Sequence, residues 1–142
     1  MTVADGKGTP IGVCVASASP SETKLLDAAL ETVSVRRLRP GRPRKRPERL
    51  IGDRGYDSNA VRARLAARGI EPIIPARGNN TVATHQDGRR LRRYRRRWLV
   101  ERTHAWFQNY RRVLVRYERR AALYLAFVHL ACALTVLNKV LG

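Results

Sequence analysis

Residues 50–58 constrain the fold of this chain more than any other stretch. Two apolar residues lead into a Gly-Asp pair, a second glycine follows, and a serine precedes an apolar run with helical spacing. This order predicts a short buried strand, a tight turn and a helix N-cap at Ser58. Asp53 would then lie at the carboxyl end of a strand, where ligands gather in open α/β sheets. The alternative interpretation is an aspartate that only closes the strand through its own turn hydrogen bonds.

The charge of the chain points to a polyanionic partner. Its 142 residues include 29 Lys and Arg against 11 Asp and Glu, a net charge of +18. Such an excess predicts nucleic-acid binding. Eight basic residues fall within residues 36–49 together with three prolines, which exclude a helix there. This loop is either a solvated linker or an arm that contacts phosphates, and its charge density favours an arm with contacts from Arg42, Arg44, Lys45 and Arg46.

The remaining pattern predicts a single α/β domain over residues 1–142. Apolar stretches at 2–4 and 11–16, separated by an Asp-Gly turn, predict a hairpin in which Asp5 is a turn residue. The segment Ser19-Pro20-Ser21-Glu22 predicts a capping box with proline at the first helical position, so a helix is expected after Ser19. Further elements are expected as a helix over 58–68, a proline-containing edge strand over 70–75, and C-terminal helices over 94–113 and 119–140.

Glu101 falls outside the apolar face of the helix predicted over 94–113. Arg97 lies four residues earlier on the same side, so an intrahelical ion pair is the alternative to a chemical role for Glu101. Trp98 and Trp106 are predicted to be core residues rather than platforms for stacked bases. Seven of the residues in 89–97 are arginine, so the start of this helix is a second candidate DNA-binding segment.

An aspartate at the end of a strand and a glutamate on a helix, in a strongly basic chain, are candidate ligands of a metal-dependent nuclease site. Mg²⁺ prefers carboxylate oxygens and keeps waters that a substrate phosphate can replace. Two such ions can activate the attacking hydroxyl and stabilise the leaving oxygen of a phosphodiester. This chemistry normally needs a third carboxylate besides Asp53 and Glu101.

Residues 121–137 contain no formally charged side chain if His129 is neutral, and 17 residues is the lower limit for a membrane span. A buried helix that closes the core is the favoured interpretation, with membrane association as a weaker alternative. Cys14 and Cys132 lack metal-ligand spacing and are expected to be reduced core residues of a cytoplasmic protein. The first residues lack the basic start and apolar region of a signal peptide.

Several segments resemble the DDE-type transposases of bacterial insertion sequences, in the large group numbered four and five. The segment around Asp53 is similar to their "D-K/R-G-Y-D" motif at the second catalytic aspartate. The spacing of Tyr94, Arg97 and Glu101 is similar to their signature around the catalytic glutamate. Further similarity is found in Val100-Glu101-Arg102-Thr103, Ala105-Trp106, Tyr110-Arg111-Arg112 and Phe127-Val128-His129-Leu130-Ala131.

The resemblance implies a ribonuclease H-like mixed sheet flanked by helices and DNA transposition with Mg²⁺ or Mn²⁺. Asp53 and Glu101 would be catalytic metal ligands. Tyr94, Arg97 and the neighbouring Arg93 would contact DNA, together with the basic loop. The partners expected from the resemblance are insertion-sequence ends and, in a complete enzyme, further copies of the transposase.

Two departures from the family pattern matter. Gln108 stands where the family signature often has lysine. The first catalytic aspartate normally lies on a strand before the hairpin, so we expect an N-terminally truncated, C-terminal part of a catalytic domain. Such a part would be inactive alone and completed by an upstream half of the transposase. The alternative function is a non-catalytic, basic nucleic-acid-binding protein.

Overall fold

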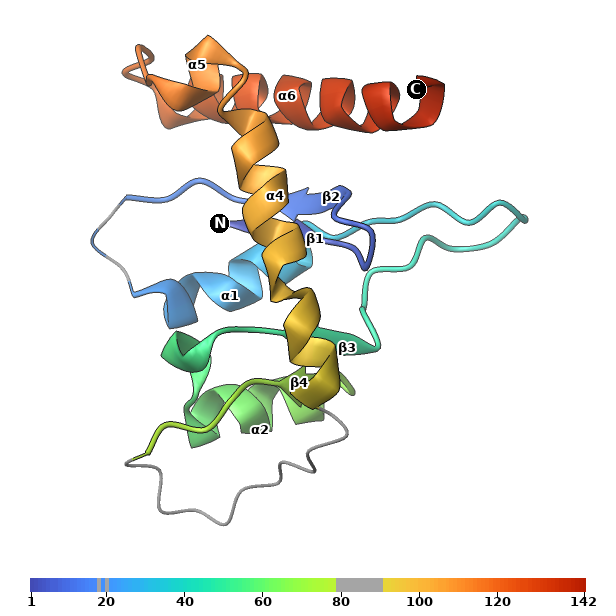
Figure 1. The fold of residues 1–142 in the computed structure, drawn as a ribbon, viewed down its shortest axis with the longest axis vertical. Helices are drawn as coiled ribbons and strands as arrows, with labels where there is room; N and C mark the ends of the chain where they lie inside the picture. Colours follow the sequence, from blue (N-terminus) through green and yellow to red (C-terminus); the bar gives the residue numbers. More distant parts are fainter. Residues whose placement is uncertain (18, 20, 79–90) are drawn as a thin grey trace. The chain divides into compact units, whose positions relative to one another are not determined.

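The computed structural model of the protein describes residues 1–17, 19, 21–78 and 91–142. These residues form two compact units, each of mixed α/β structure (Figure 1). Unit 1 combines Met1–Lys45 with Leu99–Gly142, and unit 2 consists of Arg46–Trp98. The predicted α/β class is confirmed. The strands pair as two two-stranded sheets, one in each unit.

The N-terminal hairpin of unit 1 forms as predicted. Strands β1 (Thr2–Ala4) and β2 (Pro10–Val13) pair in antiparallel fashion. Asp5 Oδ1 accepts hydrogen bonds from the N–H groups of Lys7 and Thr9, both at 2.8 Å, so Asp5 is the turn residue that the Asp-Gly signal predicts.

Helix α1 (Glu22–Glu31) packs against the hairpin. Its apolar positions Leu26, Ala29 and Leu30 are buried, which follows from their helical spacing. The approach is close enough that a Cβ at Gly12 would lie 2.7 Å from Thr32 Oγ1. The N-cap is Ser21, two residues after the predicted Ser19, and its side chain makes no capping hydrogen bond to the helix.

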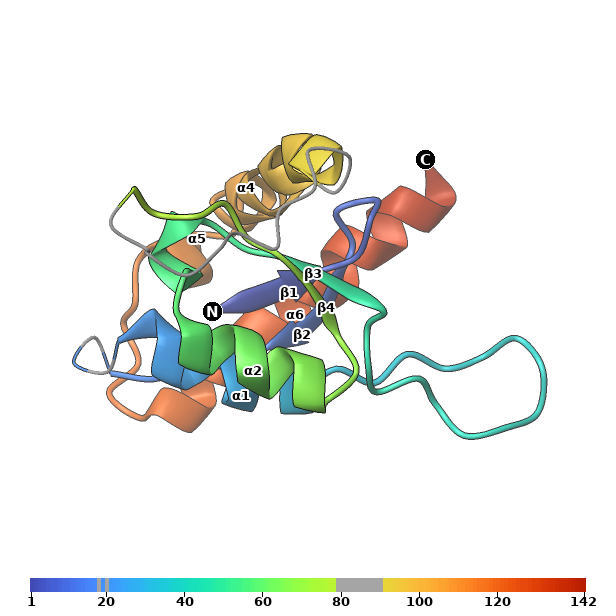
Figure 2. The same ribbon diagram turned by 90° about the horizontal axis from the view of Figure 1, so that it is seen from below.

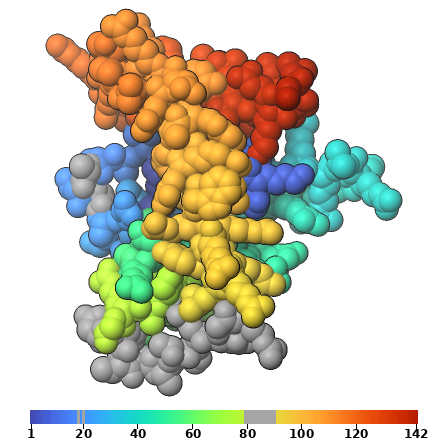
Figure 3. Space-filling model, in the orientation of Figure 1, coloured from blue at the N-terminus to red at the C-terminus, as the bar shows by residue number. Residues whose placement is uncertain are grey.

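The basic loop after α1 contains no helix, as its prolines predict. Every residue from 34 to 46 is exposed. The loop folds back on itself through a bridge in which Val35 and Arg44 exchange backbone hydrogen bonds of 2.8 and 2.9 Å. In Figure 3 its tip is the cyan lobe that projects from the rest of unit 1.

The range predicted as one helix over 94–113 is divided into three elements. A 3₁₀ helix, η2 (Arg92–Arg97), belongs to unit 2 and precedes α4 (Trp98–Phe107), which is followed by α5 (Arg111–Leu114). Like charges three and four residues apart weaken an α-helix over the arginine run. The last turn of α4 tightens, with Asn109 bonded to Trp106 O and Tyr110 to Phe107 O. Tyr110 then adopts an extended conformation and caps α5.

Helix α6 (Ala121–Leu141) matches the helix predicted over 119–140 and packs on β2 and α5. Only one of its faces is buried, at Val128, Ala131 and Thr135. Leucines on its other sides remain exposed in the part of the chain that the structure describes, so the predicted burial of this closing helix holds for one face only. By length and composition alone, α6 is apolar enough to cross a membrane, a property that core helices share.

Unit 2 is built on two parallel strands, β3 (Arg49–Ile51) and β4 (Glu71–Ile73). Between them the chain forms a short 3₁₀ helix, η1 (Arg54–Tyr56), and α2 (Asn59–Ala67). Figure 2 shows α2 beside the strand pair, and its contacts with β4 bury Val61 and Leu65. Ile70, Ile73 and Ile74 complete this core. The strand, turn and helix predicted for residues 50–68 are therefore present, although the strand was predicted to be buried and Leu50 and Ile51 are only partly buried.

Candidate active site

The carboxylate of Asp53 is oriented by a tight turn. Asp53 follows β3 after Gly52 and is the N-cap of η1. Its Oδ1 accepts a 2.7 Å hydrogen bond from the backbone N–H of Gly55. A Cβ at position 55 would lie 2.7 Å from this oxygen, which explains why glycine stands there. The turn hydrogen bond that the alternative interpretation of Asp53 predicts is therefore present.

This turn uses only one of the two carboxylate oxygens. Oδ2 of Asp53 has no hydrogen bond or ion pair with any described residue, and the side chain is partly exposed. The N–H of Gly52 donates to Ile73 O at 3.2 Å, so the pairing with β4 continues to the residue before Asp53. An oriented carboxylate with one open oxygen at the carboxyl end of a strand can ligate a cation without breaking its turn.

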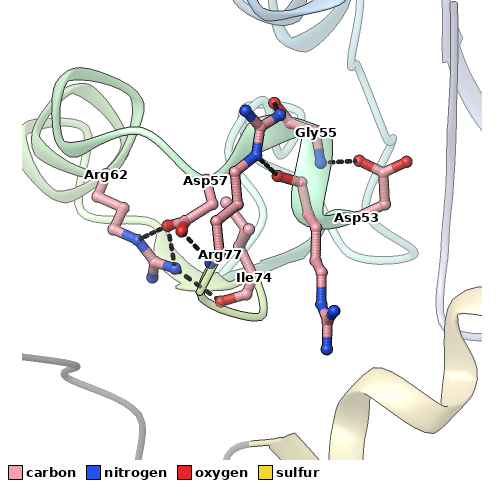
Figure 4. A network of polar contacts seen from close by, with 7 residues as sticks. Asp53, Gly55, Asp57, Arg62, Ile74 and Arg77 are labelled. Atoms are coloured by element: carbon pink, nitrogen blue, oxygen red, sulfur yellow. Dashed lines mark hydrogen bonds and ion pairs between the residues drawn. The ribbon is translucent and has the colours of Figure 1, made fainter. Parts of the chain in front are cut away.

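Behind this turn lies a buried carboxylate, that of Asp57 (Figure 4). Its Oδ1 accepts from Nε and Nη2 of Arg62 at 2.9 and 2.8 Å, and its Oδ2 accepts from the N–H of Arg77 at 2.6 Å. Nη2 of Arg62 also donates to Ile74 O at 2.7 Å. The Asp57 side chain is fully buried and is paired with an arginine, as a buried charge requires. The network thus joins η1, α2 and the residues after β4.

Glu101 lies in the first turn of α4, and its side chain is exposed. Its helix is fixed to the hairpin turn by the next two residues. Arg102 Nη2 donates to Lys7 O at 2.9 Å, and the buried Thr103 hydroxyl lies 2.7 Å from Gly8 O. Gly8 has φ +76°, and a Cβ there would lie 3.2 Å from Leu99 O. The glycine therefore permits both the turn and the close approach of α4.

A second cation fixes the same hairpin turn from α6. Lys139 Nζ donates to Lys7 O at 2.6 Å and to Thr9 Oγ1 at 3.0 Å. The Trp106 ring contacts both cations, with Arg102 Cζ at 4.9 Å and Lys139 Nζ at 5.7 Å from its centroid. These are cation–π contacts that bury part of Trp106. By contrast, Trp98 is half exposed, so its predicted place in the core is wrong.

His104 lies one turn after Glu101 on α4. Partial burial, and secondarily the positive charge of the N-terminal ammonium group, lower the pKa of His104. The side chain nonetheless keeps considerable exposed surface. The neutral imidazole is therefore favoured, and it adds no positive charge beside Glu101 at neutral pH. Burial raises the pKa of the Cys132 thiol. Cys14 and Cys132 are both only partly buried, rather than core residues as predicted.

The two candidate metal ligands belong to different units, Asp53 to unit 2 and Glu101 to unit 1. Their predicted meeting at one metal site stays a prediction. Within residues 1–17, 19, 21–78 and 91–142, no cluster of three or more His, Cys, Asp or Glu side chains is placed to hold a metal ion.

The residues predicted to contact DNA lie in two places, the 3₁₀ helix η2 and the basic loop. Tyr94, Arg97 and Arg93 all lie on η2, where Arg97 Cζ is 5.7 Å from the Tyr94 ring centroid. In the basic loop, Arg42, Arg44 and Lys45 are exposed, and their side chains form no hydrogen bond or ion pair with residues that the structure describes. Arg46 differs because its Nη1 donates to Arg68 O at 3.1 Å. Arg89 and Arg90 lie outside the described residues.

Comparison with known proteins supplies the family. The profile of a protein family described as "Transposase DDE domain" matches residues 1–136. The chain belongs to this transposase family. A curated relative, the "Putative transposase for insertion sequence element IS402" of Burkholderia cepacia, is 41% identical over 137 residues, which cover 96% of this chain. The chain spans 61% of the length of that relative. No solved structure matches the transposase chain.

Arg62 and Arg77 are the residues of this transposase domain that sequence reasoning missed. Asp57 was recognised only as part of a motif, without a partner. Arg62 follows it by five residues and Arg77 by twenty, so no single helical or strand period links the three. The sequence indicated only that Asp57 needs a partner, without indicating which one. An aspartate that lies next to the N-cap of an apolar helix must find a cation or a backbone donor once the helix is buried.

Proposed function

We propose that this chain carries the second and third acidic residues of a DNA-transposing active site, Asp53 and Glu101. The observation that supports this most is the geometry of Asp53. Its carboxylate follows a parallel strand, is held by one turn hydrogen bond and keeps one oxygen without a partner among the described residues. The substrate would be DNA at insertion-sequence ends, and the reaction would be strand cleavage and transfer.

The residues suit Mg²⁺, or Mn²⁺ in its place. Mg²⁺ is commonly held by one or two carboxylates, with waters and substrate phosphates as its other ligands. When bound, the ion would neutralise charge on the phosphodiester and increase the acidity of the attacking hydroxyl. The chain's own residues would hold and orient it. Gly55 N–H fixes the Asp53 carboxylate, and Thr103 and Arg102 fix the helix that carries Glu101.

Basic residues of the loop and of η2, together with one tyrosine, would hold the DNA. Arg42, Arg44 and Lys45 of the loop and Arg93, Arg97 and Tyr94 of η2 are the contacts proposed, with Arg46 partly engaged by Arg68 O. We further propose that the chain is part of a ribonuclease H-like catalytic domain of a cytoplasmic, nucleoid-associated transposase. The remainder of that transposase would supply the first aspartate, and the complete enzyme would act as a homo-oligomer.

The second candidate function is non-catalytic DNA binding. It is supported by the net charge of +18. Binding of a divalent cation by the two carboxylates distinguishes the two functions, because a protein that binds DNA only through its positive charge does not require a metal ion.

Mn²⁺ binding to the 142-residue chain tests the catalytic proposal. Asp53→Asn and Glu101→Gln should each weaken Mn²⁺ binding about tenfold or more, because each removes a charged oxygen ligand. Titration followed by electron paramagnetic resonance of free Mn²⁺ measures this. Glu31→Gln, at an exposed residue of α1, is the matched control and should change nothing. Equal binding by the parent chain and both variants would contradict the assignment of Asp53 and Glu101.

The basic loop should contribute to DNA affinity by neutralising phosphates. Replacing Arg42, Arg44 and Lys45 by serine should flatten the plot of log affinity against log salt by about 0.9 for each phosphate that the variant no longer neutralises. Fluorescence anisotropy with duplex DNA at several salt concentrations measures the slope. Serine at the exposed Arg119 and Arg120 provides a charge control, with a smaller change for each charge removed. If both sets change the slope equally per charge, the loop is only part of a diffuse positive surface.

A further inference from the structure

The peptide group between Arg54 and Gly55 is held from both of its ends. Its N–H, that of Gly55, donates to Asp53 Oδ1 at 2.7 Å. Its carbonyl oxygen, that of Arg54, accepts a 2.8 Å hydrogen bond from Nε of Arg77. One peptide plane therefore lies between a carboxylate and a guanidinium, as the dashed contacts of Figure 4 show.

Arg77 is held in this position by contacts on its backbone and side chain. Its N–H donates to the buried Asp57 carboxylate at 2.6 Å, and Arg62 links the same carboxylate to Ile74 O. Its Nη2 also reaches Gly55 O at 3.2 Å. Two successive carbonyls of η1 thus face a single planar guanidinium, whose donors form a rigid fork. A lysine at position 77 could not satisfy both carbonyls with this geometry.

We propose that Arg77 is a positioning residue for the Asp53 carboxylate and acts through the Arg54–Gly55 peptide. A cation on the carbonyl side polarises a peptide, which strengthens the hydrogen bond that its N–H donates. It also fixes the rotation of the peptide plane, and therefore the direction of the N–H that orients Asp53. This inference rests on the proposed role of Asp53 as a metal ligand.

The charge of Arg77 and its positioning effect predict opposite changes in metal affinity. Removing a positive charge near a cation site strengthens cation binding, because repulsion falls. Removing a residue that orients a ligand weakens metal binding, typically by about 10-fold or more. Arg54 offers the matched control, since it is an exposed arginine of the same turn whose side chain forms no hydrogen bond or ion pair with the described residues.

The experiment compares Arg77→Ala, Arg77→Lys and Arg54→Ala in the full chain. In Arg77→Ala, the Gly55 amide proton should move upfield and exchange faster in ¹⁵N-resolved NMR, and Mn²⁺ should bind about 10-fold more weakly. Arg77→Lys should restore part of both properties. Arg54→Ala should leave the Gly55 amide unchanged and bind Mn²⁺ equally or more tightly. Because Arg77 is exposed, the thermal unfolding midpoint should stay close to that of the parent chain.

Two results would overturn the positioning role. One is an unchanged Gly55 amide in Arg77→Ala, and the other is Mn²⁺ binding that tightens in Arg77→Ala as it does in Arg54→Ala. Failure of the metal assignment is recognised separately. In that case Asp53→Asn leaves Mn²⁺ binding unchanged, while the Gly55 amide still responds to Arg77→Ala.

Discussion

Asp53→Asn or Glu101→Gln will reduce metal-dependent DNA cleavage by about 1000-fold or more in an active transposase that contains this chain. A missing metal ligand costs several kcal/mol of transition-state stabilisation, and each 1.4 kcal/mol is about tenfold in rate. A suitable enzyme is a chimera in which this chain replaces the 137 aligned residues of the Burkholderia relative. The measurement is the rate of strand cleavage at the ends of a labelled insertion-sequence DNA in Mg²⁺.

The amide variants separate chemistry from folding. Asparagine at position 53 keeps an oxygen that can accept the Gly55 N–H, so the turn survives while the charge is removed. Glu31→Gln in the same chimera is the control and should cleave at the parent rate. A chimera that cleaves DNA and is unaffected by both amide substitutions would remove Asp53 and Glu101 from the active site.

The second large effect concerns the stability of unit 2. Asp57→Ala should lower the free energy of unfolding by about 3–5 kcal/mol, because it leaves Arg62 mostly buried without its carboxylate. Arg62→Ala should have a similar effect, since it leaves a buried carboxylate with fewer donors. In the double variant the decrease should be clearly less than the sum, because each single variant already breaks the same pair. Urea denaturation followed by circular dichroism measures all three.

An exposed pair in the same unit gives the comparison. Arg49 Nε lies 2.8 Å from Glu71 Oε2, as close as Arg62 lies to Asp57, but both side chains are partly open to solvent. Arg49→Ala should therefore cost less than about 1 kcal/mol through this pair. Equal decreases in stability for the exposed and the buried pair would show that burial of Asp57 does not set its contribution.

Local signals in the sequence predicted most of the elements. The Asp-Gly turn placed Asp5, the strand-turn-helix order placed Asp53, and apolar spacing placed the helices α1 and α2. Each of these signals lies within about ten residues, where backbone conformation and side-chain hydrogen bonds decide the structure. The turn around Asp53 was predicted together with its rival interpretation, and the hydrogen bond from Gly55 is compatible with both.

Features that depend on distant residues were not predicted. The division of residues 94–113 into η2, α4 and α5 reflects arginine repulsion and a tightened helix end, which apolar spacing does not report. The partners of Asp57 come from α2 and from the residues after β4. Apolar content predicted that α6 is a helix, but it could not show that only one face would be covered, because coverage depends on which elements pack there.

The contacts of Arg102, Thr103 and Lys139 with the hairpin turn affect the order in which the protein folds during its synthesis on the ribosome. These contacts span 95 to 132 residues of sequence, whereas unit 2 is one continuous segment. At roughly 5–20 residues per second, Gly8 waits on the order of 5–20 s for Thr103 to be made. All residues of unit 2 are made before Thr103 and Lys139. The hairpin can pack on α1 early but lacks its contacts with α4 and α6 until those helices are made, so their synthesis is the step that commits unit 1 to its fold.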